Sequence, residues 1–247
     1  MRELRTDDGR RRVEQVRTRI EAACARAGRS PKDVDIVAVA KTFGPEAVVE
    51  AVAAGLRLIG ESKVQEAKQK IPLCPGGLEW HMVGHLQRNK VRDAVELFSM
   101  IHSIDSMRLM EAVNSACEEA GKVMPVLLEV NVSGEASKFG LTPADVPDVL
   151  GKCGKLMNVS VVGIMTIAPF AEDPEDVRQY YKRLRELRDE WRGKTGFGLE
   201  ELSMGMSNDF EMAVEEGATL VRLGTVLFGE RAKDIRGQTT EDPATLR

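Results

Sequence analysis

The chain alternates between short apolar runs and amphipathic stretches, and this alternation repeats along its length. Residues 33–41 (DVDIVAVAK) are too continuously apolar and too rich in β-branched side chains for a half-exposed strand. They predict a strand that is buried on both faces, as in a parallel sheet. Residues 44–55 (GPEAVVEAVAAG) then predict a short helix, because Pro stands in its first turn and Gly at its end.

A helix is also expected before the first strand. Four apolar residues recur there at helical spacing, namely Val13, Val16, Ile20 and Ala23. Arg and Glu occupy the positions between them, so residues 11–28 predict an amphipathic helix that ends near Gly28.

Counting strand-then-helix units gives eight behind this leading helix. The further expected strands are residues 56–61, 78–85, 98–105, 123–133, 159–168, 201–207 and 219–225. The helices expected between them are residues 62–70, 87–97, 106–121, 142–153, 173–191 and 208–217. Strands that alternate with helices predict right-handed crossovers and a parallel sheet. Eight units in about 225 residues favour a closed (β/α)8 TIM barrel, with an extra N-terminal helix, over an open doubly wound sheet.

Two features argue against other architectures. A dinucleotide-binding fold would place GxGxxG after the first strand, and KTFGPE stands there instead. No shift in composition and no Pro/Gly/Ser-rich linker marks a second domain. We therefore expect one domain over residues 1–247, with its barrel core at about 34–230.

The composition is that of a soluble protein with a large aliphatic core, with 43% hydrophobic, 30% charged and 4% aromatic residues. A net charge of −4 gives no electrostatic basis for binding nucleic acid. No apolar run is long enough for a membrane span, and no apolar segment follows the charged first residues as in a signal peptide. The four cysteines, Cys24, Cys74, Cys117 and Cys153, are far apart, which favours free thiols and a cytoplasmic location.

Polar or small residues stand at the carboxyl ends of the predicted strands, where active sites of barrels form. They are Lys41-Thr42, Gly60-Glu61-Ser62, Gly84-His85, Ile104-Asp105-Ser106, Asn131-Val132-Ser133, Met165-Thr166, Met206-Ser207 and Gly224-Thr225. Any one of them could simply end a strand or cap a helix. The repetition at the same end of every strand favours a site.

Lys41 is the most informative of these residues. It follows IVAVA, so its stem is expected against apolar walls at the mouth of the barrel. An amine that loses its water shell there has a lowered pKa and can attack an aldehyde to form a Schiff base. The alternative is a lysine that extends along the wall into water.

The last two units predict an anion site. Ser207 is a candidate cap for the helix at 208–217, and helix N-termini present free N–H groups to phosphate. Gly224 permits close approach of the backbone to a ligand, and Thr225 adds a hydroxyl. Loops after strands seven and eight often bind phosphate in barrels. A lysine opposite a phosphate site suggests pyridoxal phosphate or a phosphorylated sugar.

The histidines do not predict a metal site. His81 and His85 lie four residues apart, but on a strand that spacing spans ~13 Å, too far for one metal ion. No cluster of Cys or carboxylates completes a set of ligands. We expect His81 to be structural and His85 to lie near the mouth of the site.

Several segments resemble the pyridoxal phosphate homeostasis proteins. They are VAVAKTFGPEAV, LIGESKVQEA, WHMVGHLQRNK, VNVSGEASKFG, GIMTIAPF and LSMGMSNDFEMAVEEGATLVRLGTVLFGER. The resemblance runs from about residue 12 to about residue 234. It implies a barrel similar to that of alanine racemases without their second domain, and a role in intracellular vitamin B6 homeostasis with no established reaction.

The resemblance also implies roles for individual residues. Lys41 would hold pyridoxal 5′-phosphate as a covalent aldimine, and Ser207, Gly224 and Thr225 would hold its phosphate. Arg222, on the same strand face as Gly224, would approach the pyridine nitrogen. The remaining residues expected at the cofactor are Ser62, Met206 and Asn131. Ser62 departs from the family, which commonly has Asn there, so one contact with the cofactor is in question.

The alternative function is a pyridoxal phosphate-dependent amino-acid racemase or a related enzyme. A two-base racemase needs a second base opposite the lysine, and similar racemases use a Tyr from their other domain. Here Tyr180 and Tyr181 lie in a helix expected outside the barrel. Arg222 would also disfavour protonation of the ring nitrogen and weaken carbanion chemistry. These points favour a non-catalytic carrier over an enzyme, while a phosphosugar enzyme remains a third alternative.

The expected partners follow from the carrier interpretation. They are pyridoxal phosphate itself and, as recipients, apo-forms of pyridoxal phosphate enzymes. We expect no nucleic acid and no membrane partner, and a monomer, because the domain that builds the racemase dimer is absent from this sequence.

Overall fold

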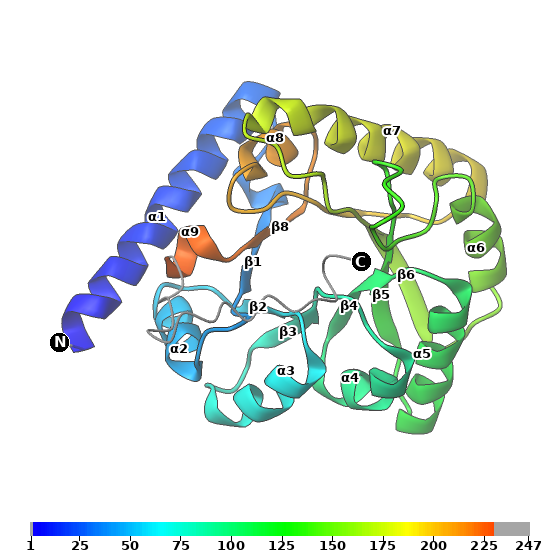
Figure 1. Ribbon diagram of the computed structural model, residues 1–247, viewed down its shortest axis with the longest axis horizontal. Helices are drawn as coiled ribbons and strands as arrows, with labels where there is room; N and C mark the ends of the chain where they lie inside the picture. The colour runs from blue at the N-terminus through cyan, green and yellow to red at the C-terminus, as the bar shows by residue number, and fades with distance from the viewer. Residues whose placement is uncertain (1, 230–247) are drawn as a thin grey trace.

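Eight parallel strands close into a barrel in the order β1-β2-β3-β4-β5-β6-β7-β8. The computed structural model describes the backbone of residues 2–229 and the side chains of residues 8–229. The strands are β1 (Asp35–Val39), β2 (Leu58–Glu61), β3 (Glu79–Met82), β4 (Met100–Ile104), β5 (Met124–Glu129), β6 (Val159–Met165), β7 (Glu201–Ser203) and β8 (Leu220–Leu223). The predicted (β/α)8 barrel is thus confirmed (Figure 1).

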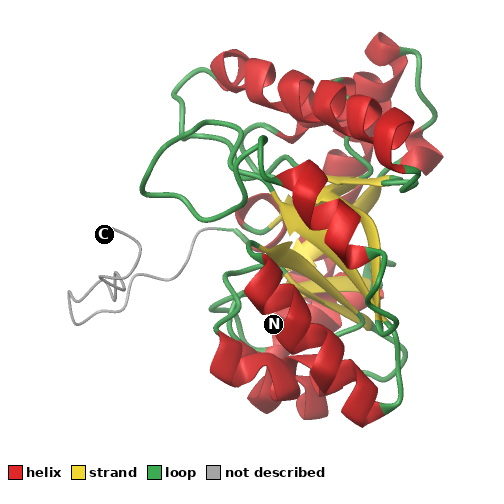
Figure 2. Ribbon diagram, turned by 90° about the vertical axis from the view of Figure 1, so that its right-hand side faces the viewer, coloured by secondary structure: helices red, strands yellow, loops and turns green. Residues whose placement is uncertain are grey.

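A ring of helices surrounds the strands, as Figure 2 shows from the side with the longer loops gathered on the left. The helices between the strands are α2 (Pro45–Ala53), α3 (Val64–Lys70), α4 (Val91–Leu97), α5 (Met107–Ala120), α6 (Val146–Cys153), α7 (Arg178–Thr195) and α8 (Phe210–Glu215). A four-residue helix, α9 (Thr225–Phe228), follows β8. Short 3-10 turns stand at Pro31–Asp33, Ile71–Leu73, Arg88–Lys90 and Pro174–Val177.

The leading helix α1 (Arg2–Ala27) completes the ring of helices. It packs against α2, α8 and α9, and so lies between the last and the first helices of the barrel (Figure 1). The four apolar residues that predicted it are all buried. Arg19 and Arg26 pair with Glu211 and Glu215 of α8, each at 2.6 Å. The helix begins at Arg2, nine residues before its expected start.

Alternation along β1 separates two apolar cores. Ile36 and Ala38 belong to the large core between the strands and the helices. Val37 and Val39 belong to a second cluster inside the barrel, together with Val83, Leu127, Met165 and Leu220. β1 ends at Val39, and Lys41 follows two residues later. The strand thus delivers Lys41 to the carboxyl-end opening of the barrel, where it lines a cavity.

Polar side chains share the barrel interior with this small apolar cluster. The buried side chains there include Glu129, His81, His102, Ser203 and Arg222. Glycines keep the strands close beside them: a Cβ on Gly163 would lie 2.1 Å from the Glu201 carbonyl oxygen. Buried polar groups in folded proteins are nearly always hydrogen-bonded, so we expect specific contacts among these side chains.

None of the helices in residues 2–229 combines the length and the apolar character that a bilayer crossing requires. The single-domain prediction covers the whole chain, and its last part, residues 230–247, lies outside the described residues.

Candidate functional site

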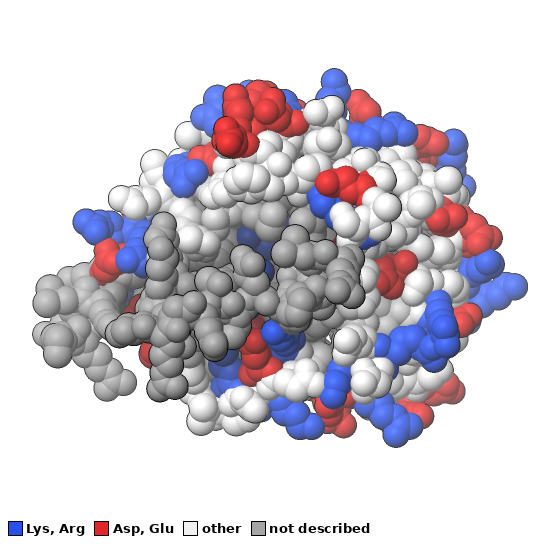
Figure 3. Space-filling view, in the orientation of Figure 1, with Lys and Arg blue, Asp and Glu red and all other residues white. Residues whose placement is uncertain are grey.

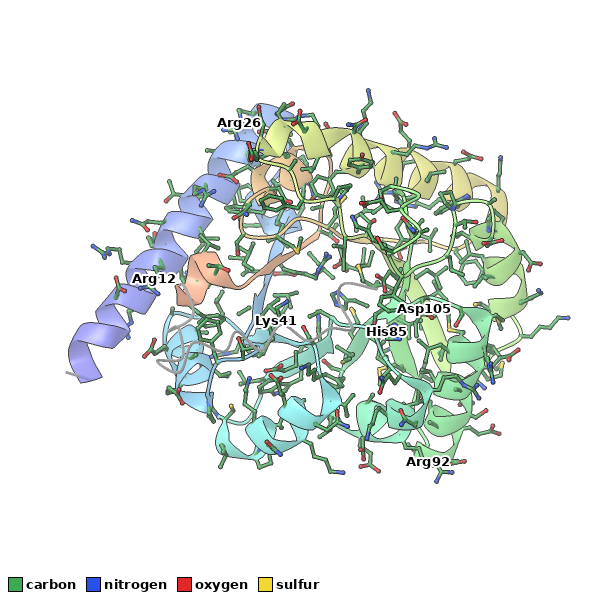
Figure 4. All side chains as sticks on the ribbon, in the orientation of Figure 1. Arg12, Arg26, Lys41, His85, Arg92 and Asp105 are labelled. Atoms are coloured by element: carbon green, nitrogen blue, oxygen red, sulfur yellow. The ribbon has the colours of Figure 1, made fainter. Side chains whose placement is uncertain are left out.

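A cavity of about 470 Å³ opens at the carboxyl ends of the strands. This volume is in the range of small-molecule sites. Seven of the eight residues predicted at the cofactor line it: Lys41, Ser62, Met206, Ser207, Arg222, Gly224 and Thr225. In Figure 4, Lys41 lies near the middle of the barrel opening. Residues from β1, β2, β7 and β8 thus meet at one cavity, as their strand-end positions indicated.

Asn131 is the exception. It is absent from the residues that line the cavity. Its amide is used within its own loop: Nδ2 donates to the Glu135 carbonyl at 2.9 Å, and Oδ1 accepts from Ser133 and the Gly134 N–H. In this structure Asn131 shapes the loop that follows β5 and does not reach the cavity.

Ser207 lies at the cavity, but its predicted role as a cap of its own helix is wrong. The residue at the cap of α8 is Asp209, whose Oδ1 accepts the Met206 N–H at 2.6 Å. Ser207 Oγ instead accepts the N–H groups of Gly224 and Val226, each at 3.3 Å. The reason is the tight turn between Met206 and Asp209, which turns the Ser207 hydroxyl toward β8. Ser207 therefore joins the loops after β7 and β8.

Two glycines allow close packing beside these loops. Gly205 has φ +90°, and a Cβ there would lie 2.6 Å from the Ala213 side chain of α8. A Cβ on Gly224 would lie 3.3 Å from the Val39 carbonyl oxygen of β1. A side chain at Gly205 would push its loop away from α8, and one at Gly224 would press against β1.

Arg222 lines the cavity from below and is held on two sides. Its Nη1 donates to Ser203 Oγ at 2.7 Å, and its Nη2 donates to the Thr166 carbonyl at 2.9 Å. Only 5% of the residue is exposed. Burial lowers the pKa of the guanidinium from its ordinary value, but arginine stays charged in proteins. The cavity therefore has a fixed cation beneath it.

A hydrogen-bonded chain continues from Arg222 to two histidines. His102 Nδ1 lies 2.9 Å from Ser203 Oγ, and His102 Nε2 lies 3.0 Å from His81 Nδ1. Burial lowers the pKa of His81 to about 4 and that of His102 well below its usual value, so both rings are neutral at pH 7. We assign the Ser203 hydroxyl as the donor and His102 Nδ1 as the acceptor. If His102 donated instead, the buried Ser203 hydroxyl proton would have no acceptor. His81 is structural, as expected.

His85 does not line the cavity, in contrast to the expectation that it lies near the mouth. It pairs with Asp105, with 3.2 Å between Nδ1 and Oδ2, and stacks on Phe139 with ring centroids 3.9 Å apart. Figure 4 shows His85 and Asp105 side by side. Within residues 2–229 no group of three His, Cys, Asp or Glu is placed to hold a metal ion.

Glu129 is a buried carboxyl group near Arg222, and only 6% of the residue is exposed. Burial raises its pKa to about 7, the charge of Asp105 adds to the rise, and Arg222 opposes it. The ionised form is thus unfavourable in the folded state, and stability falls as the pH rises from 4.5 to 7.

We therefore predict that Glu129→Gln stabilises the protein at pH 8 by about 3 kcal/mol, the equivalent of the difference between pKa values of 4.5 and about 7. At pH 5 the gain should be below about 1 kcal/mol, because Glu129 in the folded wild-type protein is then largely protonated and as neutral as the glutamine of the variant. Urea unfolding at the two pH values measures the difference. A variant that is less stable than the wild type at pH 8 would show that attraction to Arg222 outweighs burial.

Further residues that the strand-end positions did not reveal also line the cavity. Lys138 comes from the loop after β5, and its Nζ pairs with Glu135 at 2.6 Å and donates to the Ile167 carbonyl at 3.4 Å. Asp209 and the loop over residues 167–174 contribute as well. They lie in loops, where position along a strand carries no signal.

The rim of the cavity is apolar and exposed, while the wider face carries mixed charge. Phe170 is 84% exposed, Ile167 39% and Met206 37%. Among the residues that Figure 3 colours, blue and red side chains are interspersed over this face, without a large area of one sign. This pattern gives no electrostatic basis for binding a polyanion.

A second cavity, of about 520 Å³, lies at the opposite end of the barrel. It is lined by strand starts, such as Asp35 and Glu79, and by α1 and the turn after it. Although it is larger, catalytic and ligand sites of barrels form at the carboxyl ends of the strands. We therefore assign function to the smaller cavity around Lys41.

Comparison with known proteins shows the family of the chain. The family model for the alanine racemase N-terminal domain matches residues 12–232. The "Pyridoxal phosphate homeostasis protein" of Aquifex aeolicus is 44% identical over 89% of this chain and 97% of the relative. That of Bos taurus is 39% identical over 94% of this chain and 90% of the relative.

Solved structures agree. PipY of Synechococcus elongatus with PLP bound has a TM-score of 0.76 and 38% identity, covering 85% of this chain and all of PipY. An alanine racemase of Clostridium difficile has a TM-score of 0.71 at 14% identity, covering 92% of this chain and 58% of the racemase. The second likeness is one of fold alone, and the racemase extends beyond the matched barrel.

Proposed function

Because the chain belongs to the family of pyridoxal phosphate homeostasis proteins, we propose that it binds pyridoxal 5′-phosphate in the Lys41 cavity as a Schiff base and acts in vitamin B6 homeostasis. In this role it is a carrier or regulator of the cofactor rather than an enzyme. The observation that carries the proposal is the position of Lys41 and of Ser207, Gly224 and Thr225 around a single cavity.

The chemistry of the donor set fits the cofactor. Two hydroxyls and a glycine backbone stand together at the ends of β7 and β8, and such groups bind phosphate oxygens. Lys41, at the end of β1, offers a primary amine to an aldehyde. Arg222 lies beneath the cavity and would donate to the unprotonated pyridine nitrogen. Pyridoxal phosphate supplies an aldehyde that condenses with amines and a ring that accepts electron density.

The rest of the cavity favours retention over turnover. Neither tyrosine lines it: Tyr181 is buried between α7 and the barrel, and Tyr180 lies beside it on the same helix. Lys138 is held in an ion pair with Glu135. Arg222 would hold a positive charge beside the pyridine nitrogen, which would oppose protonation of that nitrogen. Together these features support a carrier that holds the cofactor without reacting it further.

The proposal also includes transfer of the cofactor to apo-enzymes, a monomeric state and a cytoplasmic location. The exposed apolar rim at Ile167, Phe170 and Met206 would give an accepting protein a surface beside the cavity. The bound cofactor could then leave for an acceptor without entering bulk solution.

The experiment is a titration of the purified protein with pyridoxal 5′-phosphate, followed by absorbance and by equilibrium dialysis. The double variant Ser207→Ala/Thr225→Ala should bind more weakly, because each hydroxyl that bonds a charged phosphate contributes about 1.5–3 kcal/mol. The matched control is Ser99→Ala, whose hydroxyl bonds the Trp80 carbonyl away from the cavity. Equal affinity in the double variant and the wild type would refute the phosphate assignment, and no binding by the wild type would refute the function.

A further inference from the structure

Lys41 sits in a tight turn with an unusual backbone. The Ala40 carbonyl accepts the Phe43 N–H at 3.1 Å, so residues 40–43 form a β-turn with Lys41 and Thr42 at its centre. Thr42 has φ +68°, in the left-handed region. This conformation is favourable for glycine and unfavourable for a β-branched residue, so other contacts must hold the turn.

Helix α3 supplies contacts on both sides of Lys41. Before it, Lys70 Nζ donates to the Ala40 carbonyl at 2.7 Å. After it, the Thr42 N–H donates to Glu66 Oε2 at 3.1 Å. Glu66 and Lys70 are one helical turn apart and so share a face of α3. A single short helix thus holds the two peptide groups that flank Lys41.

The Lys70 ammonium is itself fixed by a buried carboxylate. It pairs with Glu61 at the end of β2, directly before Ser62. Glu61 is fully buried and Lys70 is 6% exposed. Glu61 Oε2 has no hydrogen-bond partner, and burial raises the pKa of the group from its usual value despite the nearby ammonium.

Stability alone does not account for this arrangement. A buried ion pair often stabilises a fold no better than apolar side chains of the same size, because both charges lose their water. Here one carboxylate oxygen also lacks a partner, and the backbone at Thr42 is strained. What the pair does provide is a fixed donor at the carbonyl that precedes Lys41.

We propose that Glu61, Glu66 and Lys70 are positioning residues that hold the strained Ala40–Phe43 turn, so that the Lys41 amine is aimed at the carbonyl carbon of the ligand in the cavity. This inference rests on the proposed function. The amine adds to the aldehyde carbon, a C=N bond forms, and the aldehyde oxygen leaves as water. This addition requires the amine to approach the carbonyl carbon closely and from one direction. A turn that no longer fixes Lys41 should therefore slow the addition, while the phosphate site stays unchanged.

The variants separate positioning from folding. Glu66→Ala removes the acceptor for the Thr42 N–H, whereas Glu66→Gln retains one and serves as the rescue. Thr42→Gly relieves the backbone strain and keeps the N–H that donates to Glu66, so the turn should keep its shape. Glu61→Gln/Lys70→Met removes the buried charges together. Lys68→Met, on the same helix but paired with Asp93 on the surface, is the matched control.

Two ligands distinguish covalent attachment from binding. Pyridoxal 5′-phosphate can condense with Lys41, whereas pyridoxine 5′-phosphate has an alcohol in place of the aldehyde and cannot. Stopped-flow absorbance gives the rate of attachment for the first, calorimetry gives the affinity for the second, and thermal unfolding reports the fold.

We expect Glu66→Ala and the double variant to attach the aldehyde about tenfold or more slowly. Their affinity for pyridoxine 5′-phosphate should stay within about twofold of wild type, and Glu66→Gln and Lys68→Met should behave as wild type in both assays. Thr42→Gly should attach the aldehyde at the wild-type rate and unfold at or above the wild-type temperature, because glycine favours the left-handed turn.

Unchanged attachment rates in Glu66→Ala and in the double variant would overturn the inference and leave the proposed function standing. An equal loss of affinity for pyridoxal 5′-phosphate and pyridoxine 5′-phosphate would also overturn it, because α3 would then shape the whole cavity. A wild-type protein that binds pyridoxine 5′-phosphate but never attaches the aldehyde would overturn the Schiff base and the positioning role together.

Discussion

Loaded with pyridoxal 5′-phosphate and incubated with L-alanine, the protein should form D-alanine far more slowly than about one turnover per second, the low end for ordinary enzymes. Racemisation needs an acid and a base on opposite sides of the reacting carbon, and each such group contributes about 10²–10⁴-fold. Lys41 can serve one side. Among residues 8–229, no tyrosine lines the cavity to serve the other.

Arg222 adds to this deficit. Its guanidinium is fixed beneath the cavity by Ser203 and Thr166 and cannot move away from the ring. A fixed cation disfavours a proton on the pyridine nitrogen, which lowers the acidity that the ring can confer on a bound amino acid. Chiral chromatography of each L-amino acid after incubation measures the outcome, with Lys41→Ala as the blank. Turnover above about one per second would establish an enzyme and refute the carrier interpretation.

The substitution Lys70→Met should lower the free energy of unfolding by about 3–5 kcal/mol, because it leaves the Glu61 carboxylate buried without its partner. The paired change Glu61→Gln/Lys70→Met should recover most of this loss, since no uncompensated charge remains. Urea unfolding at pH 7 provides the comparison.

The surface lysine of the same helix is the control for that series. Lys68 pairs with Asp93 in water-exposed surroundings, so Lys68→Met should change stability by less than about 1 kcal/mol. If Lys70→Met were as mild as Lys68→Met, the Glu61–Lys70 pair would contribute nothing to the fold. If the double variant were as unstable as the single one, the loss would come from the Ala40 contact and not from the stranded charge.

The barrel was predictable because its signal is local. Val37 and Val39 alternate with Ile36 and Ala38, and all four are buried, as a strand between two apolar layers requires. The strand-end position of Lys41 then followed from counting. The leading helix was placed correctly by its apolar stripe, but its first nine residues contain a single large apolar residue, Leu4, and gave no periodic signal.

The contacts that organise the site were not predictable, because they join residues distant in the chain. The chain from Arg222 through Ser203 and His102 to His81 unites four strands, and each residue alone resembles an ordinary strand residue. Ser207 illustrates the same limit: its position indicated a cap, but a tight turn directs its hydroxyl across to α9.

The left-handed backbone at Thr42 had no signal in the sequence, because threonine is not a residue that normally marks such a turn. The same holds for Lys70, which in an amphipathic helix is expected to point into water. The pairing of β1 with β2, and the return of α3 over them, brings the Ala40 carbonyl and the Glu61 carboxylate to it.

Reduction of the loaded protein with borohydride, followed by peptide mass spectrometry, tests the central claim most directly. The reduction makes the bond between the cofactor and its lysine permanent, so the adduct marks the residue that held it. A single adduct on Lys41, absent in Lys41→Ala, is the predicted result. An adduct on Lys138, the other lysine that lines the cavity, or on any lysine outside it would contradict the account.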